Sequence, residues 1–476
     1  MLPPFEIHQP RTVEEAVAAR RRFGDSAAVY AGGTELVLVM KEGLGAYEHL
    51  IDVKAIPDLQ GLALRDGTNP LLSIGAAVTH RALARSAVIR ERFPVLAEME
   101  SAVANARVRA VGTLGGNLAF AEPHSDPPTA LLVHDATVAL AGPRGIRTLP
   151  LGEFMRSSYE TALEPDEILV QIDVPEPADG TAGAYLKFGL HERPTIGVAV
   201  LLQLDGARRV IANARVAVGC VGPVPVRLPA LESALSRAPL STLQQDFPAA
   251  AHAGDALDAV SDLHGSADYK RHLVGVFATR ALVIAARRAS ERPPRRAAVG
   301  STLSPGLPGD REGSPTAITM TVNGRRVDLA IRPEDLLLDV LRDRLGLRGS
   351  KRSCDVQVCG ACTVLVDDAP VSSCSVLAYE ARGRRVLTIE GLADGDRLHP
   401  LQKAFVGESA FQCGYCTPGM ILASKAILDD DPDATLDDIR EHLRGNICRC
   451  TGYVNILRAV AAARNAMAVP QGRPRS

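Results

Sequence analysis

The chain has 476 residues, of which 46% are hydrophobic, and a formal net charge of −2 at pH 7. This length predicts roughly three or four globular domains, and the near-neutral charge argues against nucleic acid or an anionic membrane surface as the main partner. No apolar run reaches the roughly 18 residues of a membrane helix, and the first residues lack a secretory-leader pattern. We therefore expect a cytoplasmic protein without a membrane span, in which cysteines stay reduced.

The N-terminal part alternates short apolar runs with helical stretches, a mixture that predicts an α+β fold. The expected strands include Leu71–Ile74, Thr137–Ala141, Ile168–Val174 and Val198–Leu204, and the expected helices include Val13–Phe23 and Arg81–Ser86.

Two Gly-Gly-polar segments lie in this part: Gly32-Gly33-Thr34 and Gly115-Gly116-Asn117. Paired glycines let successive backbone N–H groups converge on an anion such as a pyrophosphate, although each segment alone is equally typical of a tight turn. Asp126 is a candidate acceptor for cofactor hydroxyls, but taken alone it is more typical of a helix cap before Pro128. The ninth cysteine, Cys220, lies in an apolar run, which predicts a buried and inert thiol.

Residues 288–316 are rich in proline, glycine and charge, and they lack periodic apolar positions. This composition predicts a linker. It separates a cysteine-poor N-terminal part from a cysteine-rich C-terminal part, so we expect the two parts to fold as separate units.

After the linker, Ile318–Val322 and Val327–Ile331 flank an Asn323-Gly324 turn, a strong hairpin signal. A helix over Leu336–Leu345, the first cysteine loop and a second hairpin then follow, an order that looks like the β-grasp ferredoxin fold. The second hairpin spans Thr363–Val366, the Asp367-Asp368 turn and Val371–Cys374. From Pro400 onward four helices are expected: Leu401–Phe405, Met420–Leu428, Leu436–Leu443 with Thr435 as N-cap, and Val454–Met467.

Eight of the nine cysteines fall into two sets of four: Cys354, Cys359, Cys362 and Cys374, then Cys413, Cys416, Cys448 and Cys450. The first set has the plant-ferredoxin spacing, which predicts a 2Fe-2S cluster. Zinc is the alternative, but structural zinc sites favour paired Cys-x2-Cys hooks, whereas four residues separate Cys354 from Cys359, which lets the loop wrap a larger inorganic core. The second set is less diagnostic by itself. Because both sets lie in one module, we interpret it as the ligands of a second cluster.

These motifs together resemble the molybdenum hydroxylases of the xanthine dehydrogenase and carbon monoxide dehydrogenase family. The N-terminal part resembles the FAD-binding subunit, and the C-terminal part resembles the small iron–sulfur subunit more sharply. The N-terminal motifs are Gly32-Gly33-Thr34-Glu35-Leu36, Thr113-Leu-Gly-Gly-Asn117, Asp166-Glu-Ile-Leu169 and Tyr185-Leu-Lys187; the C-terminal ones are Cys359-Gly-Ala-Cys362, Gln412-Cys-Gly-Tyr-Cys416 and Asn446-Ile-Cys448-Arg-Cys450.

The resemblance implies roles for individual residues. It places FAD on the backbone amides of Ala31–Leu36 and Thr113–Asn117, with Asp126 on its hydroxyls and Leu169 and Lys187 along the pocket. It implies that the first cysteine set holds the cluster nearer the flavin and the second set the cluster nearer molybdenum. It further implies that Gln412 meets a molybdopterin at the interface with a large subunit.

The implied fold is α+β. It comprises an FAD-binding domain of the PCMH type (1–175) with an α+β C-terminal domain (176–287), the linker (288–316), a β-grasp 2Fe-2S ferredoxin domain (317–392) and an all-α 2Fe-2S helical bundle (393–468). The implied function is electron transfer from a molybdopterin centre on a separate large subunit, through two 2Fe-2S clusters, to FAD and an external acceptor. The implied assembly is a dimer of heterodimers. A stand-alone iron–sulfur flavoprotein that carries electrons from NAD(P)H is the alternative.

The sequence departs from the family pattern in two places. Ser353 precedes Cys354, and Gln357 stands where glycine is usual, which leaves the geometry of the first cluster loop and its redox potential open. The order of parts also differs, because the flavin region precedes the iron–sulfur region.

Overall fold

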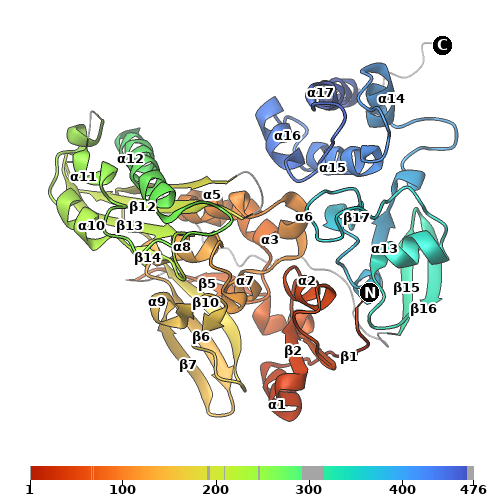
Figure 1. Cartoon of the computed structure of the whole chain (residues 1–476), viewed down its shortest axis with the longest axis horizontal. Helices are drawn as coiled ribbons and strands as arrows, with labels where there is room; N and C mark the ends of the chain where they lie inside the picture. Colours follow the sequence, from red (N-terminus) through yellow and green to blue (C-terminus); the bar gives the residue numbers. More distant parts are fainter. Residues whose placement is uncertain are drawn as a thin grey trace.

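The computed structural model describes residues 2–65, 67, 69–189, 193–207, 209–244, 247–291 and 316–468. Figure 1 shows the N-terminal part on one side and the C-terminal part on the other, with α6 (Ala106–Val111) at the boundary between them. The combination of sheets and helices confirms the predicted α+β class.

The first sheet is parallel and has the strand order β1-β3-β2. Helix α1 (Val13–Phe23) begins at Thr12, whose Oγ1 accepts a hydrogen bond from the amide of Glu15, and it ends where Gly24 takes a positive φ of 53°. This helix is confirmed at both ends. The strands are β1 (Glu6–His8), β2 (Ala27–Tyr30) and β3 (His49–Asp52).

The second sheet is antiparallel and has the order β4-β5-β10-β6-β7. The strands predicted for this sheet are confirmed to within a residue or two. Alternate side chains of these strands enter a hydrophobic core of the N-terminal part. The strands are β4 (Leu62–Arg65), β5 (Leu71–Gly75), β6 (Thr137–Gly142), β7 (Gly145–Pro150) and β10 (Ile168–Pro175), with a small ribbon of β8 (Met155–Ser157) and β9 (Glu160–Thr161). Helix α2 (Leu36–Lys41) packs with the first sheet instead. The other helices of this part are α3 (His80–Arg85), α4 (Ala87–Arg92), α5 (Pro94–Ala102), α7 (Leu114–Phe120), α8 (Pro127–Val133) and α9 (Leu151–Phe154).

The third sheet is an antiparallel meander covered by the long helix α12 (Ala267–Glu291). This helix corrects the predicted start of the linker, because it continues through Arg288 to Glu291. Ala289 is buried, and the Arg288 guanidinium bonds Glu98 and the carbonyl of Gly183, so the last turn is held by packing. Residues 292–315 of the predicted linker lie outside the described residues. The elements are β11 (Thr181–Phe188), β12 (Ile196–Leu204), β13 (Ile211–Gly219), β14 (Val226–Arg227), α10 (Pro229–Leu235) and α11 (Pro248–Ala251).

The fourth sheet has the order β16-β15-β19-β17-β18 and contains both predicted hairpins. Each two-residue turn has positive φ at both positions, 49° and 78° at Asn323-Gly324 and 47° and 66° at Asp367-Asp368, as turns of this type require. The strands are β15 (Ala317–Val322), β16 (Arg325–Ala330), β17 (Thr363–Val366), β18 (Ala369–Ser372) and β19 (Arg385–Leu387).

The helix predicted over Leu336–Leu345 is not one regular helix. A single turn, α13 (Leu337–Asp339), leads directly into a π-helical stretch, η5 (Val340–Arg344). Leu336, Leu337, Leu338, Val340 and Leu341 are all buried, and one face of an α-helix cannot bury so many neighbouring positions. The wider π turn accommodates this packing.

Four helices form the C-terminal bundle, as predicted. Thr435 caps α16 in a reciprocal capping box with Asp438. The helices are α14 (Pro400–Gly407), α15 (Thr417–Asp430), α16 (Leu436–Leu443) and α17 (Val454–Ala468).

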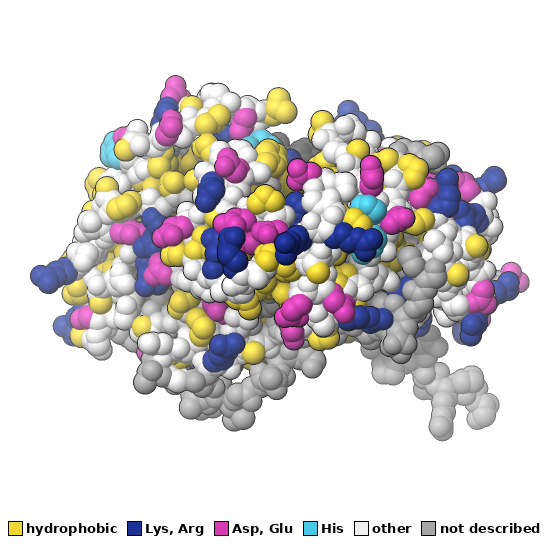
Figure 2. Space-filling view, turned by 90° about the horizontal axis from the view of Figure 1, so that it is seen from below, with side chains coloured by type: hydrophobic (Ala, Val, Ile, Leu, Met, Phe, Trp, Pro, Cys, Tyr) yellow, Lys and Arg dark blue, Asp and Glu magenta, His cyan; other side chains and the backbone are white. Residues whose placement is uncertain are grey.

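One hydrophobic core is shared by the N-terminal and C-terminal parts. Phe5, Tyr30 and Met40 pack in the same cluster as Met320 and Leu337. The two parts therefore do not behave as independent units, which corrects that expectation. On the face in Figure 2, acidic and basic side chains are interspersed. Among the described residues, no helix combines the length and apolar character needed to cross a bilayer.

Candidate cofactor sites

A cavity of about 790 Å³ opens between the first sheet, α7 and the start of β10. Both glycine segments line it, and so do Asp126 and Leu169. Its wall is completed from the C-terminal part by Val356, Gln357 and Val358, which belong to the first cysteine loop. One cavity therefore joins the flavin motifs to the loop of the first cysteine set.

The first glycine segment presents unpaired amides to this cavity. Within the described residues, the backbone N–H groups of Gly32, Gly33, Thr34 and Glu35 have no hydrogen-bond partner. Gly33 has a φ of 66°, and a Cβ on Gly32 would lie 2.3 Å from the carbonyl oxygen of Val111. Glycine is thus required at both positions, and the open amides form the kind of concave nest that binds phosphate oxygens.

The second glycine segment approaches the cavity differently. The amide of Gly115 donates to the carbonyl of Ala76, and that of Gly116 donates to Oγ1 of Thr113, which caps α7. The amide of Asn117 is used within the helix turn. Because these amides already bond within the protein, this segment does not form a second nest. It lines the cavity with its two glycines and with the polar side chains of Thr113 and Asn117.

Asp126 does not cap α8. Its side chain makes no capping bond, since the carboxylate is engaged by residues of another element, and Pro127 and Pro128 have no N–H to donate. The buried carboxylate instead accepts hydrogen bonds from the Tyr185 hydroxyl at 2.6 Å and from Nζ of Lys187 at 2.9 Å. Lys187 does not line the cavity directly but holds Asp126 at its edge. Burial, followed by the charge of Asp126, raises the pKa of Tyr185 well above its ordinary value.

The thiols of the first cysteine set lie together at the base of the ferredoxin sheet. The amides of Val356 and Cys359 donate to Sγ of Cys354 at 3.5 and 3.3 Å. A hydrogen bond from Cys354 lowers the pKa of the Cys359 thiol to about 5, and an equivalent bond from Cys362 lowers that of Cys374 to about 6. The same two bonds raise the pKa of the donor thiols, Cys354 and Cys362, so each pair favours one thiolate, the form that binds iron or zinc.

The second cysteine set lies at the ends of α15 and α17 and is more exposed. Sγ of Cys450 and Sγ of Cys413 are 3.6 Å apart, and Thr451 donates to Sγ of Cys448. Burial, followed by a hydrogen bond with the neighbouring Cys448, raises the pKa of Cys416 to about 12. Gln412 is exposed beside this set, and its amide donates to the carbonyl of Cys450 at 3.1 Å.

Cys220 is buried, and its thiol lies 3.9 Å from the carbonyl of Ser125, outside both sets. Burial raises the pKa of this thiol well above its ordinary value. An unreactive core thiol, as predicted, fits this environment.

Arg107 of α6 joins the flavin part to both cysteine regions, a role that sequence reasoning missed. The side chain is 1% exposed and donates to the carbonyls of Gln357 and Gly445 at 3.1 and 2.7 Å, and to Asn446 and Ser372. Nearby, Nζ of Lys41 donates to the carbonyls of Asp355 and Cys374. No local motif marks such residues, because their partners lie more than 200 positions away.

Family models match nearly the whole described chain. They are the FAD binding domain in molybdopterin dehydrogenase over residues 3–177, the CO dehydrogenase flavoprotein C-terminal domain over 191–285, the 2Fe-2S iron-sulfur cluster binding domain over 320–388 and the [2Fe-2S] binding domain over 388–461. The carbon monoxide dehydrogenase medium chain of Hydrogenophaga pseudoflava is 36% identical over 286 residues, which cover 59% of this chain and 97% of that protein.

The chain belongs to the molybdenum hydroxylase family. Its iron–sulfur part is 47% identical over 148 residues to the beta subunit of the 6-hydroxypseudooxynicotine dehydrogenase complex of Paenarthrobacter nicotinovorans, covering 31% of this chain and 92% of that protein. A solved carbon monoxide dehydrogenase of Hydrogenophaga pseudoflava superposes with a TM-score of 0.56 at 35% identity, covering 61% of this chain and 99% of that one. Within this family, the chain is an FAD and 2Fe-2S oxidoreductase subunit. Its flavin part and its iron–sulfur part match two separate relatives, and here they are joined in one polypeptide.

Proposed function

We propose that the chain carries electrons from a molybdopterin centre on a separate large subunit to FAD and then to an external acceptor. The observation that carries this proposal is the shared cavity, in which the first cysteine loop forms part of the wall beside the open glycine segment. When bound, a 2Fe-2S cluster passes single electrons, and FAD takes them singly and can release them as a pair.

We propose that FAD occupies this cavity. The amides of residues 32–35 would hold the pyrophosphate, and Asp126 would accept from hydroxyls of the cofactor. Leu169 would pack against the cofactor, and the ammonium group of Lys187 would balance the negative charge of the buried Asp126 carboxylate. Thr113, Gly115, Gly116 and Asn117 would shape the opposite wall without donating their committed amides.

We propose that each cysteine set holds one 2Fe-2S cluster. Four thiols per set match the ligand count, and amides directed at Cys354 would hydrogen-bond its thiolate. The family matches over residues 320–388 and 388–461 support the same assignment and the division into domains at 1–175, 176–287, 317–392 and 393–468.

We propose that the large subunit docks over the second cysteine set. Exposed apolar side chains surround this set, namely Phe411, Tyr415, Ile447, Tyr453 and Val454. Clustered exposed apolar residues of this kind typically mark a protein interface, and Gln412 would then meet the molybdopterin there. A dimer of such heterodimers in the cytoplasm is the assembly we propose.

Anaerobic purification of the full chain tests the cofactor assignment. We expect about four iron atoms and one releasable FAD per chain. Cys359→Ala and Cys448→Ala should each lower the iron content by about half, whereas Cys220→Ala, a buried thiol outside both sets, should leave it unchanged. Zinc in place of iron would contradict the proposal.

Purification of the tagged chain from its native host tests the partner. A large molybdopterin-containing chain should copurify, and substitution of the exposed Phe411 and Tyr415 by serine should release it while iron and FAD are retained. Rapid reduction of the isolated chain by NAD(P)H without any such partner would favour the stand-alone carrier.

A further inference from the structure

A cluster of three potential metal ligands lies at the edge of the first sheet, apart from the cofactor cavity. Glu6 and His8 belong to β1, and His49 begins β3. Glu6 and His49 are direct partners in the parallel register, and His8 follows Glu6 by two residues. Residues two apart on a strand share a face, so the register places all three side chains on the same side of the sheet.

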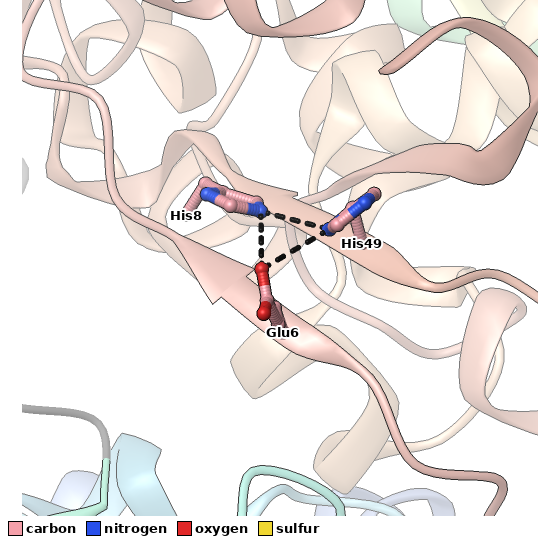
Figure 3. A group of neighbouring side chains, drawn as sticks. All are labelled: Glu6, His8 and His49. Atoms are coloured by element: carbon pink, nitrogen blue, oxygen red, sulfur yellow. Dashed lines mark hydrogen bonds and ion pairs between the residues drawn. The ribbon is translucent and has the colours of Figure 1, made fainter.

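The three ligand atoms converge on one point. Nε2 of His8 and Nδ1 of His49 are 3.1 Å apart, and Oε2 of Glu6 lies 3.7 Å from the first and 3.5 Å from the second (Figure 3). A point about 2.0 Å from all three atoms exists within this triangle, which is the bond length of zinc to imidazole nitrogen and carboxylate oxygen. The carboxylate is too far from either ring for a hydrogen bond, so hydrogen bonding does not account for its position.

The imidazoles are held in place from one side. The ring of Phe23, the last residue of α1, lies 4.5 Å from the His8 ring and 4.0 Å from the His49 ring, measured between centroids. The side chains of His8 and His49 are 28% and 18% exposed, which leaves the cluster open to solvent ions. Arg22 lies close enough to influence His8, and its positive charge opposes a cation there.

We propose that Glu6, His8 and His49 form a binding site for a divalent transition metal of the zinc type. Two imidazoles with a single carboxylate suit zinc, nickel or copper better than calcium or magnesium, which prefer oxygen ligands. Three protein ligands leave a fourth position for water. Bound metal would fasten the edge strand β1 to β3.

Zinc binding to the holoprotein, with FAD and both clusters in place, tests this proposal. Equilibrium dialysis against zinc chloride should give one zinc per chain with the iron content unchanged. His49→Gln and Glu6→Gln should weaken zinc binding by more than about tenfold. The matched control is His252→Gln, an exposed histidine whose ring pairs with Asp255, and it should leave the affinity unchanged.

Two further measurements separate a metal site from a simple hydrogen-bonded histidine pair. Arg22→Gln removes the opposing charge and should raise the zinc affinity, and zinc should slow hydrogen exchange of the β1 amides in the wild type but not in His49→Gln. Equal zinc uptake by the wild type and His49→Gln, with iron and FAD intact in both, would overturn the proposal.

Discussion

The side-chain amide of Gln357 donates a 2.8 Å hydrogen bond to the main-chain carbonyl of Thr34. Gln357 has a φ of 64°, a conformation in which glycine is favoured, and it is buried. The departure from glycine noted in the sequence therefore has a structural use. The loop keeps the backbone conformation of a glycine while its side chain ties the first cysteine loop to the flavin segment.

Gln357→Gly should preserve the cysteine loop and weaken flavin binding. Glycine fits the positive φ without strain, but the bond to Thr34 is lost, and one such bond is worth about 1 kcal/mol. The dissociation constant of FAD should rise roughly fivefold while iron content stays constant. Asp368→Gly is the control, because Asp368 also has a positive φ but lies in an exposed turn. Equal FAD affinity in the wild type and Gln357→Gly would contradict the predicted tie.

Arg107→Met should separate the unfolding of the two parts of the chain. The substitution leaves the buried carbonyls of Gln357 and Gly445 without their charged donor, which should cost about 1–3 kcal/mol for each carbonyl. Scanning calorimetry should show two resolved transitions in place of a shared one. Arg81→Gln removes an exposed contact to Asp430 across the same boundary and should cost less than about 1 kcal/mol. A single unshifted transition in Arg107→Met would show that the shared hydrophobic core suffices alone.

Lys187→Met should release flavin more readily than Tyr185→Phe. The lysine compensates the buried Asp126 carboxylate, so its loss should cost about 3–5 kcal/mol, whereas loss of the tyrosine hydroxyl should cost about 1 kcal/mol. The flavin-to-iron ratio of the purified variants measures the difference. Lys425→Met, which breaks a pair with Asp429 on the helical bundle, should keep the wild-type ratio. The reverse order for the two test variants would argue against charge compensation.

Stability should decrease on acidification because of His134. Burial lowers the pKa of this imidazole to about 3, and neither ring nitrogen has a hydrogen-bond partner among the described residues. The unfolded chain, with a histidine pKa near 6.5, takes up the proton first, so the stabilising contribution is complete above about pH 6.5 and falls as the pH is lowered towards 3.

Between pH 7.5 and 5 the loss from His134 should be about 2 kcal/mol. Denaturant unfolding of the full chain at the two pH values measures it. His134→Leu should remove this part of the pH dependence. Val133→Ala on the same helix should lower the stability by a similar amount at both pH values. An unchanged pH dependence in His134→Leu would contradict the assignment.

The sequence correctly predicted those structural features that depend on neighbouring residues. The Asn323-Gly324 and Asp367-Asp368 turns and the Thr435 cap depend on residues within a few positions of one another, and the first cysteine set was recognised from its spacing. The prediction of FAD came from the resemblance to a known family, which also supported the prediction of two 2Fe-2S clusters. The prediction failed at Leu336–Leu345, where burial on several sides replaces a regular helix with a π turn.

Asp126 illustrates a second failure. Thr129 offers an amide in the first turn, so the sequence alone does not exclude the cap, yet the Asp126 side chain makes no capping bond. The partners that Asp126 uses instead, Tyr185 and Lys187, lie about 60 residues away on β11. Arg107 likewise depends on tertiary structure, since its guanidinium contacts three segments that are separate in the sequence.

The buried Arg107 and the shared core also determine how the fused flavin and iron–sulfur parts stay associated. In a complex of separate subunits, docking of the iron–sulfur component onto the flavoprotein depends on the concentration of each. Here the same contact is intramolecular, at an effective concentration on the order of millimolar. Dilution should therefore not dissociate it, and the two components are always produced in equal amounts.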